Sequence, residues 1–424
     1  MATTKANELG QIIDSIVPSS LGTAGQVLTV NSGATAATFA DAGGGADLYA
    51  AESVGATDPT ASGTKSIAIG HSVTSTGQNS VSIGALSDAT GNSSLAIGGQ
   101  TQATAAGATA IGWPAQASGA YSTSIGVNSG TNKSISAGVA SFAAMGSYAS
   151  GTDSFAASIA NNTTSYGASG SNSVAMGSQA KATGISAVAL SKSASATGHY
   201  SVAIGWTTGV SGTESAALAG RGASASGIRS LALGNFAKAS AQDTIAISNE
   251  GSGYYTEASA IKAIAIGTRA LSNIKGKLAV SNGAFSANGD SQTGTFVMRS
   301  DTTDATAEAM TTNNSTASTD NQVILPNNSC FGFTGTVIAR ENSAQTNDFA
   351  VWEIKGGAVR AANASTTALG TYNINKISES TGATNWSIAL SADTTNGAVA
   401  ITVTGEASHS IRWVATVNTT EVIY

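Results

Sequence analysis

The fold is decided by a five-residue phrase that the chain repeats, first written Ser66-Ile67-Ala68-Ile69-Gly70. The phrase returns as Ser80-Val81-Ser82-Ile83-Gly84 and as Ser94-Leu95-Ala96-Ile97-Gly98, so that the closing glycines lie 14 residues apart. Further copies end at positions 112, 126, 177, 191, 205, 219, 234, 248, 267 and 281. A fixed period of this kind indicates a repeat architecture.

Each phrase alternates between branched aliphatic and small residues, which is typical of a short β-strand. Ile67 and Ile69 share one face, and Ala68 lies on the other. We expect the aliphatic face to point into the repeat and the small face to point outward. Small residues also recur three and five places after the phrase, as at Ala115 and Ala117, and predict a second, facing strand.

Fourteen residues are too few for a βαβ unit, which needs about 30. They fit one coil of a parallel β-solenoid, in which neighbouring coils stack and pair. An outer face of small residues lacks the charge that keeps a lone solenoid soluble. We therefore expect side-by-side self-association into a homotrimer, although the repeat itself predicts association and not the number three.

The stretches 79–84 (NSVSIG) and 172–177 (NSVAMG) closely resemble the repeats of trimeric autotransporter adhesin heads. The resemblance extends over roughly residues 63–290. It implies a left-handed parallel β-roll, with three rolls packed into one head. The stretch 127–172 departs from the strict register, and an insertion near 251–255 lengthens one step to 19 residues.

The composition favours a repetitive β-fibre over an enzyme. The 424 residues include 50 glycines, while charged residues make up 10% and aromatic residues 5%. The net charge of −6 and the lack of a basic patch argue against nucleic-acid binding. Cys330 is the only cysteine, which excludes an intrachain disulfide and a cysteine-based metal site, and we expect it to be buried.

The amino-terminal residues 1–8 contain no basic segment followed by an apolar run, so we expect no secretion signal. No stretch approaches the about 18 apolar residues that a membrane helix needs, so we expect no membrane insertion. A complete trimeric autotransporter would need an export signal, a stalk and a membrane barrel, as the resemblance implies.

Residues 5–17 are predicted to form a short amphipathic helix that ends before Pro18. Its apolar face is the expected virion anchor and consists of Leu9, Ile12, Ile13 and Ile16. The following stretch 21–33 (LGTAGQVLTVNSG) resembles a segment near the amino termini of phage tail-fibre proteins, which favours a phage fibre over a bacterial adhesin. Residues 42–46 are expected to be a flexible joint.

The 14-residue period ends near residue 293. Nine longer candidate strands, separated by turn clusters such as 394–397 (TTNG), predict an antiparallel β-sandwich. This part resembles the carboxy-terminal globular domains of marine phage structural proteins. We therefore predict an all-β chain with three parts: a virion-attachment segment over 1–46, a β-roll shaft over 47–292 and a sandwich tip over 293–424.

No catalytic constellation emerges from the sequence. The histidines His71, His199 and His409 lie far apart and lack metal-ligand spacing. Acidic residues within the roll are isolated, whereas glycan cleavage needs paired carboxylates. We therefore expect no catalytic residues, no metal, no cofactor and no enzymatic activity.

If the chain binds a receptor, aromatic and basic residues of the tip are the candidates, because rings stack on sugars and cations hold hydroxyl groups. These residues are Trp352, Arg360, Tyr372, Trp386, Arg412 and Trp413. The alternative, which we favour for the three tryptophans, is that they fill the core of the sandwich.

Together these features predict a homotrimeric phage tail fibre or spike that mediates attachment to the host surface. It would be made in the host cytoplasm without a signal peptide and would reside in the virion. Its expected partners are tail or baseplate proteins at the amino terminus and a host cell-surface glycan or protein at the tip. The alternatives are the passenger of a bacterial trimeric surface adhesin and a polysaccharide-degrading tailspike, which would require an acidic cleft.

Overall fold

The computed structural model describes residues 57–127, 133–159, 165–249, 251, 254–341 and 347–424, and the backbone of three strands before residue 57. The predicted helix over 5–17 and the anchor residues Leu9, Ile12, Ile13 and Ile16 lie outside these residues. The chain forms two compact units, Met1–Ala157 and Ser158–Tyr424.

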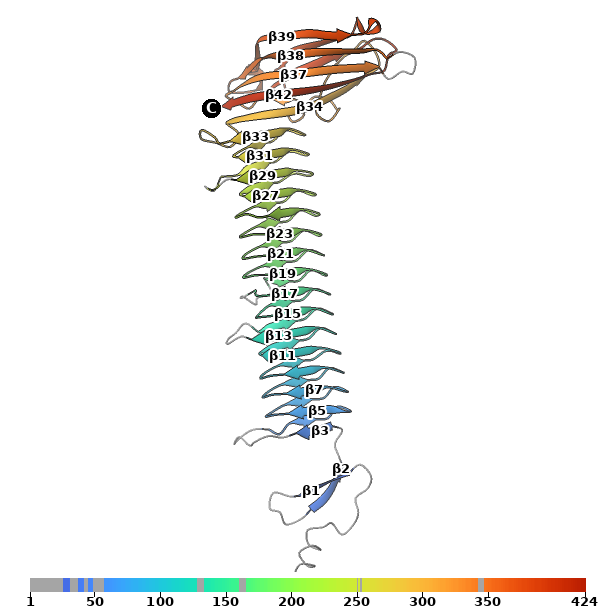
Figure 1. Ribbon diagram of the computed structural model, residues 1–424, viewed down its shortest axis with the longest axis vertical. Helices are drawn as coiled ribbons and strands as arrows, with labels where there is room; N and C mark the ends of the chain where they lie inside the picture. The colour runs from blue at the N-terminus through green and yellow to red at the C-terminus, as the bar shows by residue number, and fades with distance from the viewer. Residues whose placement is uncertain are drawn as a thin grey trace, which may run out of the picture. The chain divides into compact units, whose positions relative to one another are not determined.

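The first unit contains a parallel β-roll with two strands in each coil (Figure 1). Its longer sheet consists of β3 (Gly45–Leu48), β5 (Ser66–Ile69), β7 (Val81–Ile83), β9 (Leu95–Ile97), β11 (Thr109–Trp113), β13 (Thr123–Val127), β15 (Phe142–Ala144) and β17 (Phe155–Ala157). Its facing sheet consists of β4 (Thr60–Ala61), β6 (Thr74–Ser75), β8 (Asp88–Ala89), β10 (Gln102–Ala103), β12 (Ala115–Ala117), β14 (Ser134–Ser136) and β16 (Tyr148–Ala149). An antiparallel pair, β1 (Gln26–Val30) and β2 (Ala37–Asp41), precedes them, and β3 includes the last two residues of the predicted joint.

The second unit continues the same coil pattern. Its longer sheet consists of β19 (Val174–Met176), β21 (Val188–Leu190), β23 (Val202–Ile204), β25 (Ala216–Leu218), β27 (Leu231–Asn235), β29 (Ile245–Asn249), β31 (Ile264–Thr268) and β33 (Leu278–Asn282). Its facing sheet consists of β18 (Gly167–Ala168), β20 (Lys181–Ala182), β22 (Ser195–Ala196), β24 (Gly209–Val210), β26 (Ser224–Ala225), β28 (Ala237–Ala239), β30 (Thr256–Ala258) and β32 (Leu271–Ser272). The predicted parallel β-solenoid is therefore confirmed.

The interior of the roll corrects the predicted orientation of the strands. Ala68 and Ala96 are fully buried, whereas Ile67 and Ile69 beside them are half-exposed on the outer face. The facing strand contributes small residues as predicted, and Ala117 is also fully buried. Most inward positions of both strands hold alanine or serine, with Val210 on β24 as an exception, so the space between the two sheets is narrow. The aliphatic residues therefore lie outside.

A Gly-x-x-Ser turn closes most of the coils and explains the recurring serines. The Ser80 hydroxyl donates to the carbonyl of Gly77 at 2.7 Å, and the Ser201 hydroxyl donates to that of Gly198 at 2.6 Å. The residue before the serine has a left-handed backbone, as at Asn79 (φ 55°), whose N–H donates to Thr64 of the preceding coil at 2.9 Å. This hydrogen bond between coils offsets the cost of the strained conformation.

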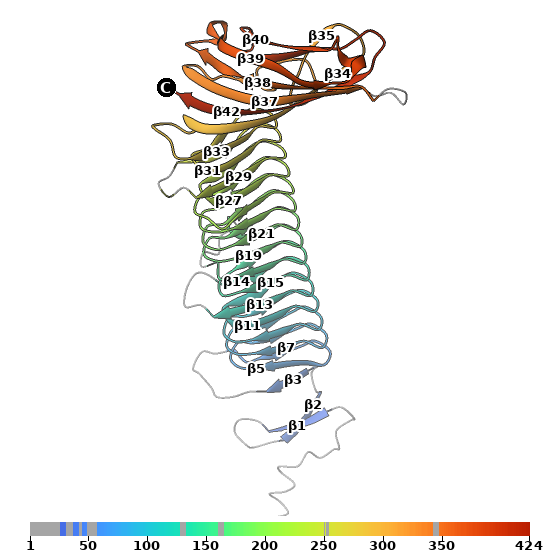
Figure 2. The same ribbon diagram turned by 45° about the horizontal axis from the view of Figure 1, so that its top comes forward.

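Beyond the roll the strands become antiparallel and much longer, and they form two layers, as predicted for the sandwich (Figure 2). The first sheet follows β33 in the order β34 (Ser291–Thr302), β42 (Ile411–Ile423), β37 (Ser329–Glu341), β38 (Phe349–Arg360) and β39 (Ala368–Glu379). In the second sheet, β41 (Ala398–Thr404) pairs with β40 (Ser387–Asp393) on one side and with β35 (Ala307–Ala309) and β36 (Val323–Ile324) on the other. The 3₁₀ helices η1 (Ala364–Thr366) and η2 (Thr381–Ala383) lie in the connections.

The sandwich core is built around three indoles in contact, of which Trp352 and Trp413 are stacked and Trp386 is tilted against Trp413. Trp352 and Trp413 have ring centroids 5.5 Å apart, and Trp386 lies 6.1 Å from Trp413. All three are at most 2% exposed. Cys330, by contrast, is exposed on the outer face of β37, so the expectation of a buried cysteine was wrong. Its alternating partners Phe331 and Phe333 take the inward positions instead.

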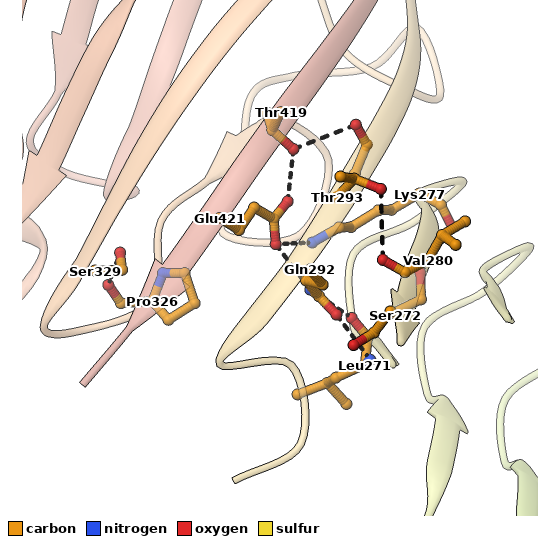
Figure 3. Close-up of polar contacts among 12 residues, drawn as sticks. Leu271, Ser272, Lys277, Val280, Gln292, Thr293, Pro326, Ser329, Thr419 and Glu421 are labelled. Atoms are coloured by element: carbon orange, nitrogen blue, oxygen red, sulfur yellow. Dashed lines mark hydrogen bonds and ion pairs between the residues drawn. The ribbon is translucent and has the colours of Figure 1, made fainter. Parts of the chain in front are cut away.

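A buried ion pair joins the last coil of the roll to the final strand of the chain (Figure 3). Lys277, in the turn before β33, places its Nζ 2.7 Å from Oε2 of Glu421 on β42, and both side chains are at most 2% exposed. Gln292 donates to the same carboxylate at 2.7 Å and to the Leu271 carbonyl at 3.0 Å, while Thr419 donates to its other oxygen at 2.6 Å. Burial lowers the pKa of Lys277, which Glu421 opposes. The network holds β42 and β34 against the last coil.

Asp290 fixes the loop between β33 and β34. Burial tends to raise the pKa of this carboxyl, but hydrogen bonds from the backbone N–H groups of Ala287, Ser286 and Phe285, with the Ser286 hydroxyl, lower its pKa overall. The three N–H to carboxylate distances are 2.7, 2.6 and 2.9 Å.

A carboxylate with a lowered folded-state pKa adds stability above the unfolded pKa of about 3.9, and this stability is lost as the pH falls through the folded value. We therefore expect Asp290→Asn to unfold at a lower temperature than wild type at pH 7, with the difference shrinking below about pH 4. Thermal midpoints of both proteins between pH 7 and pH 2 test this. A difference that stays constant over that range would show that the charge of Asp290 contributes nothing.

No helix in the part of the chain that the structure describes is long and apolar enough to span a membrane. Among the same residues, no group of three or more His, Cys, Asp or Glu side chains is placed to hold a metal ion.

Candidate binding groove

A groove of about 730 Å³ crosses the outer face of the long-strand sheet. Five strands contribute to it, because β34, β42, β37, β38 and β39 lie side by side in this order. Its lining residues are mostly small and polar, and they are Thr293, Gly294, Thr295, Gly332, Phe333, Thr334, Lys355, Gly356, Thr371, Tyr372, Asn373, Asn418, Thr419 and Thr420. Lys355 carries the only formal charge among them. The groove is thus suited to hydrogen bonding with a neutral polar ligand.

Strand alternation places every second lining residue on the outer face, whereas Phe333, Gly356, Tyr372 and Thr419 lie between them on the other face. Thr295, Asn418, Thr334, Lys355 and Asn373 form one row across the sheet, since each is the register partner of the next. The Thr295 hydroxyl donates to Oδ1 of Asn418 at 2.9 Å. This orientation leaves the Asn418 amide N–H groups as donors directed away from Thr295. A ligand in the groove would therefore meet both donors and acceptors.

Two glycines shape the floor. A Cβ at Gly332 would meet no atom within 4 Å, so the space above this residue is open. A Cβ at Gly356 would lie 2.7 Å from Cβ of Tyr372 and 2.8 Å from Cζ of Phe333, so only glycine fits there. Gly356 is the register partner of Tyr372, and the Tyr372 ring is 46% exposed. Tyr372 alternates with Asn373 along β39 and shares its face with Ile374, which packs against the sandwich core, so the Tyr372 ring points away from the polar row. The groove therefore has a low, polar floor.

The structure places the six predicted receptor-binding residues in different environments. Trp352, Trp386 and Trp413 are buried in the core, which confirms the alternative we favoured and corrects their assignment to a receptor surface. Arg360 donates from Nη1 to the Leu325 carbonyl at 2.6 Å, so it supports a loop. Arg412 is exposed and lies 3.5 Å from Asp301. Only Tyr372 lines the groove.

Most groove residues were missed by the sequence analysis, which searched for aromatic and charged side chains. The available signal was the threonine and asparagine at alternating positions, as in Thr293 and Thr295 or Asn418 and Thr420. This signal is weak, because threonine is common on the solvent face of any β-strand.

The roll of the second unit carries a second surface feature, which we call the outer ladder. It is a continuous row of register-paired, at least partly exposed aliphatic residues: Met176, Leu190, Ile204, Leu218, Leu233, Ile247, Ile266 and Val280. Met176, Ile204 and Val280 are 43%, 37% and 42% exposed. The first unit has an equivalent row from Ile69 to Ile125. Contiguous apolar rows of this kind mark contact surfaces.

The family comparison identifies the repeat itself. The model of the YadA head domain repeat matches residues 61–87, 89–113, 103–129, 168–190, 193–218 and 225–247. The roll is similar to the YadA head domain repeat over these residues. This match confirms the resemblance to adhesin heads that the phrases predicted. The matched residues fall in both units. No match covers residues 130–167, where the spacing of the phrases in the sequence is uneven.

Two solved phage structures are similar over most of the chain. One is the tailspike protein gp49 from Acinetobacter baumannii bacteriophage Fri1, a capsular polysaccharide depolymerase, with 8% identity, coverage of 93% of this chain and 75% of that chain, and a TM-score of 0.26. The other is the tailspike protein of Acinetobacter phage vB_ApiP_P1, with 12% identity, coverage of 85% and 79%, and a TM-score of 0.21. No curated protein matches the sequence.

The expectation that the chain is not an enzyme is corrected at this point. The gp49 tailspike is described as a depolymerase, so the absence of a catalytic pattern in the sequence does not justify excluding enzymatic activity. A TM-score of 0.26 does not assign that activity to this chain either.

Proposed function

We propose that this protein is the subunit of a homotrimeric phage tail fibre or spike that attaches the virion to a host-surface glycan. The observation that carries the proposal is a polar groove on a sheet whose first strand, β34, pairs directly with β33 of the last coil of the roll. In this arrangement the roll is a stiff spacer and the sandwich is the binding tip. The amino-terminal segment would join other tail or baseplate proteins.

Trimer formation is supported by the outer ladder. Burying a fully exposed aliphatic side chain contributes about 1.5–3 kcal/mol, and Ile204 is 37% exposed, so covering the rest of it would contribute about 0.5–1 kcal/mol. A row of eight such residues left in water would favour aggregation, whereas a closed symmetric assembly would cover it. The ladder thus replaces the small-residue face from which the sequence analysis inferred association.

Glycan binding is supported by the chemistry of the groove. Threonine hydroxyls and asparagine amides match the alternating donors and acceptors of a sugar. Each subunit binds weakly in this scheme, and three linked grooves raise the effective affinity through avidity.

Filling the groove tests the proposal. Gly332→Trp places a large ring in the open space above β37 without a clash, and we expect virions carrying it to lose at least about tenfold in adsorption to host cells. Thr336→Trp, on the same face of the same strand but outside the groove lining, is the matched control and should adsorb normally. Normal adsorption of the Gly332→Trp virions, with the trimer intact, would overturn the assignment of the groove.

A further inference from the structure

A row of alternating charges runs along one edge of the roll in the second unit. The row occupies one position in each coil, the residue with a left-handed backbone in the turn before the longer strand. In four successive coils this residue is Glu214, Arg229, Asp243 and Lys262. Arg229 and Asp243 form an ion pair at 2.7 Å. Hydrogen bonding from Arg229, with a smaller contribution from the charge of Lys262, lowers the pKa of Asp243. Neighbouring coils therefore neutralise one another.

The row ends at Gly276, where the pattern calls for an acidic residue. Gly276 occupies the same turn position with a φ of 68°, and a Cβ there would meet only the Cβ of Thr312, at 3.7 Å. A pocket of about 370 Å³ lies where the next side chain of the row would be. Its lining residues are Ile261, Lys262, Lys275, Gly276, Arg299, Thr312 and Asn313.

The charges around this pocket are unbalanced. Lys262, Lys275 and Arg299 line it, and no acidic residue does. Lys275 is paired with Asp320 outside the lining at 2.9 Å, and Lys262 is next to an Asp243 already held by Arg229. The Thr312 hydroxyl oxygen is buried and has no hydrogen-bond partner in the described part of the chain. An unmatched hydroxyl beside Lys262 and Arg299, with the paired Lys275 next to them, is the environment that an oxyanion requires.

We propose that this pocket binds the carboxylate of an acidic sugar, which takes the place of the missing acidic side chain above Gly276. The choice of a sugar rests on the proposed attachment function and on the position of Arg299. Arg299 and the groove residue Thr295 lie on the same face of β34, four residues or about 13 Å apart. One acidic polysaccharide chain can therefore place neutral sugars in the groove and a uronic acid in the pocket.

The first test supplies the missing anion from the protein itself. Gly276→Asp and Gly276→Asn have nearly the same shape, and both residue types tolerate a left-handed backbone. We expect the aspartate variant to have a thermal midpoint several degrees above that of the asparagine variant at low salt, with the difference lost in about 1 M salt. A Gly276→Asp variant no more stable than Gly276→Asn would show that the pocket does not favour an anion.

The second test uses purified full-length protein and polygalacturonate, with dextran as the neutral polysaccharide and polyglutamate as the acidic peptide. We expect calorimetry to detect polygalacturonate binding that Arg299→Gln weakens about tenfold and Gly276→Asp abolishes. Equal binding to the wild-type and variant proteins would overturn the site, and equal binding of polyglutamate would overturn the choice of a sugar. Neither readout uses cells, so a failure of host adsorption with these results intact would remove the attachment function and leave the pocket.

Discussion

Replacing Gly198 by alanine is expected to lower the stability of the roll by about 3 kcal/mol, at the upper end of the cost of overpacking. A Cβ at this position would lie 2.1 Å from the carbonyl oxygen of Gly212 in the next coil and 2.6 Å from its carbon. Both contacts are with backbone, which no side-chain rotation can relieve. The coils would have to separate, and the hydrogen bond from Ser201 to Gly198 would be disturbed. Scanning calorimetry measures the effect as a lower thermal midpoint.

Gly209→Ala is the matched control for this substitution. Gly209 lies one coil further along the roll, in β24, and a Cβ there would meet no atom within 4 Å. We expect its thermal midpoint to equal that of wild type or to rise slightly, because alanine restricts the unfolded chain. Equal midpoints for the Gly198→Ala and Gly209→Ala proteins would contradict the close approach of the coils.

The second large effect is expected at the junction of roll and sandwich. Glu421→Gln keeps the size of the side chain but leaves Lys277 buried beside a neutral group. Removing one partner of a buried ion pair typically costs about 3–5 kcal/mol. Because burial lowers the pKa of Lys277, the unfolded chain binds more protons between the folded and unfolded pKa values. The stability of the Glu421→Gln variant should therefore rise with pH in that window.

The double variant Lys277→Met/Glu421→Leu distinguishes two costs: that of leaving the buried Lys277 charge unpaired, and that of losing the ion pair itself. Replacing both ions by apolar residues of similar volume is often neutral or stabilising. Gln292 and Thr419 retain their hydrogen bonds to the Leu271 and Gly294 carbonyls, so the double variant should recover at least half of the loss in urea unfolding. A double variant as unstable as Glu421→Gln would show that the stranded charge is not the cause.

The 14-residue period was sufficient to predict the coil, its two strands and its parallel stacking, because few structures close in so few residues. It did not predict which face lies inside. Alternation separates Ile67 and Ile69 from Ala68, and the rule that aliphatic residues are buried chose the wrong face. Which face points inward depends on the width of the interior, and this width depends on the side chains of both strands. The Ala115 and Ala117 pattern of the second strand was the sign that the interior admits mostly small residues.

The sequence was sufficient to predict that the tip is a sandwich, but not where its groove lies. Long strands and three tryptophans indicate a two-layered core, and Trp352, Trp386 and Trp413 fill it. The groove depends on the strand order β34–β42–β37–β38–β39, which joins strands far apart in the sequence. Lys277 and Glu421 are 144 residues apart, and nothing local to either position predicts their contact.

The measurement that tests the central claim most directly is the mass of the intact protein by sedimentation equilibrium. Three subunits of 41.4 kDa that cover one another's outer ladders should sediment as a single species of about 124 kDa over a wide range of concentration. A stable species of 41.4 kDa would mean that the aliphatic rows remain in water, and it would contradict both the trimer and the avidity on which the proposed attachment depends.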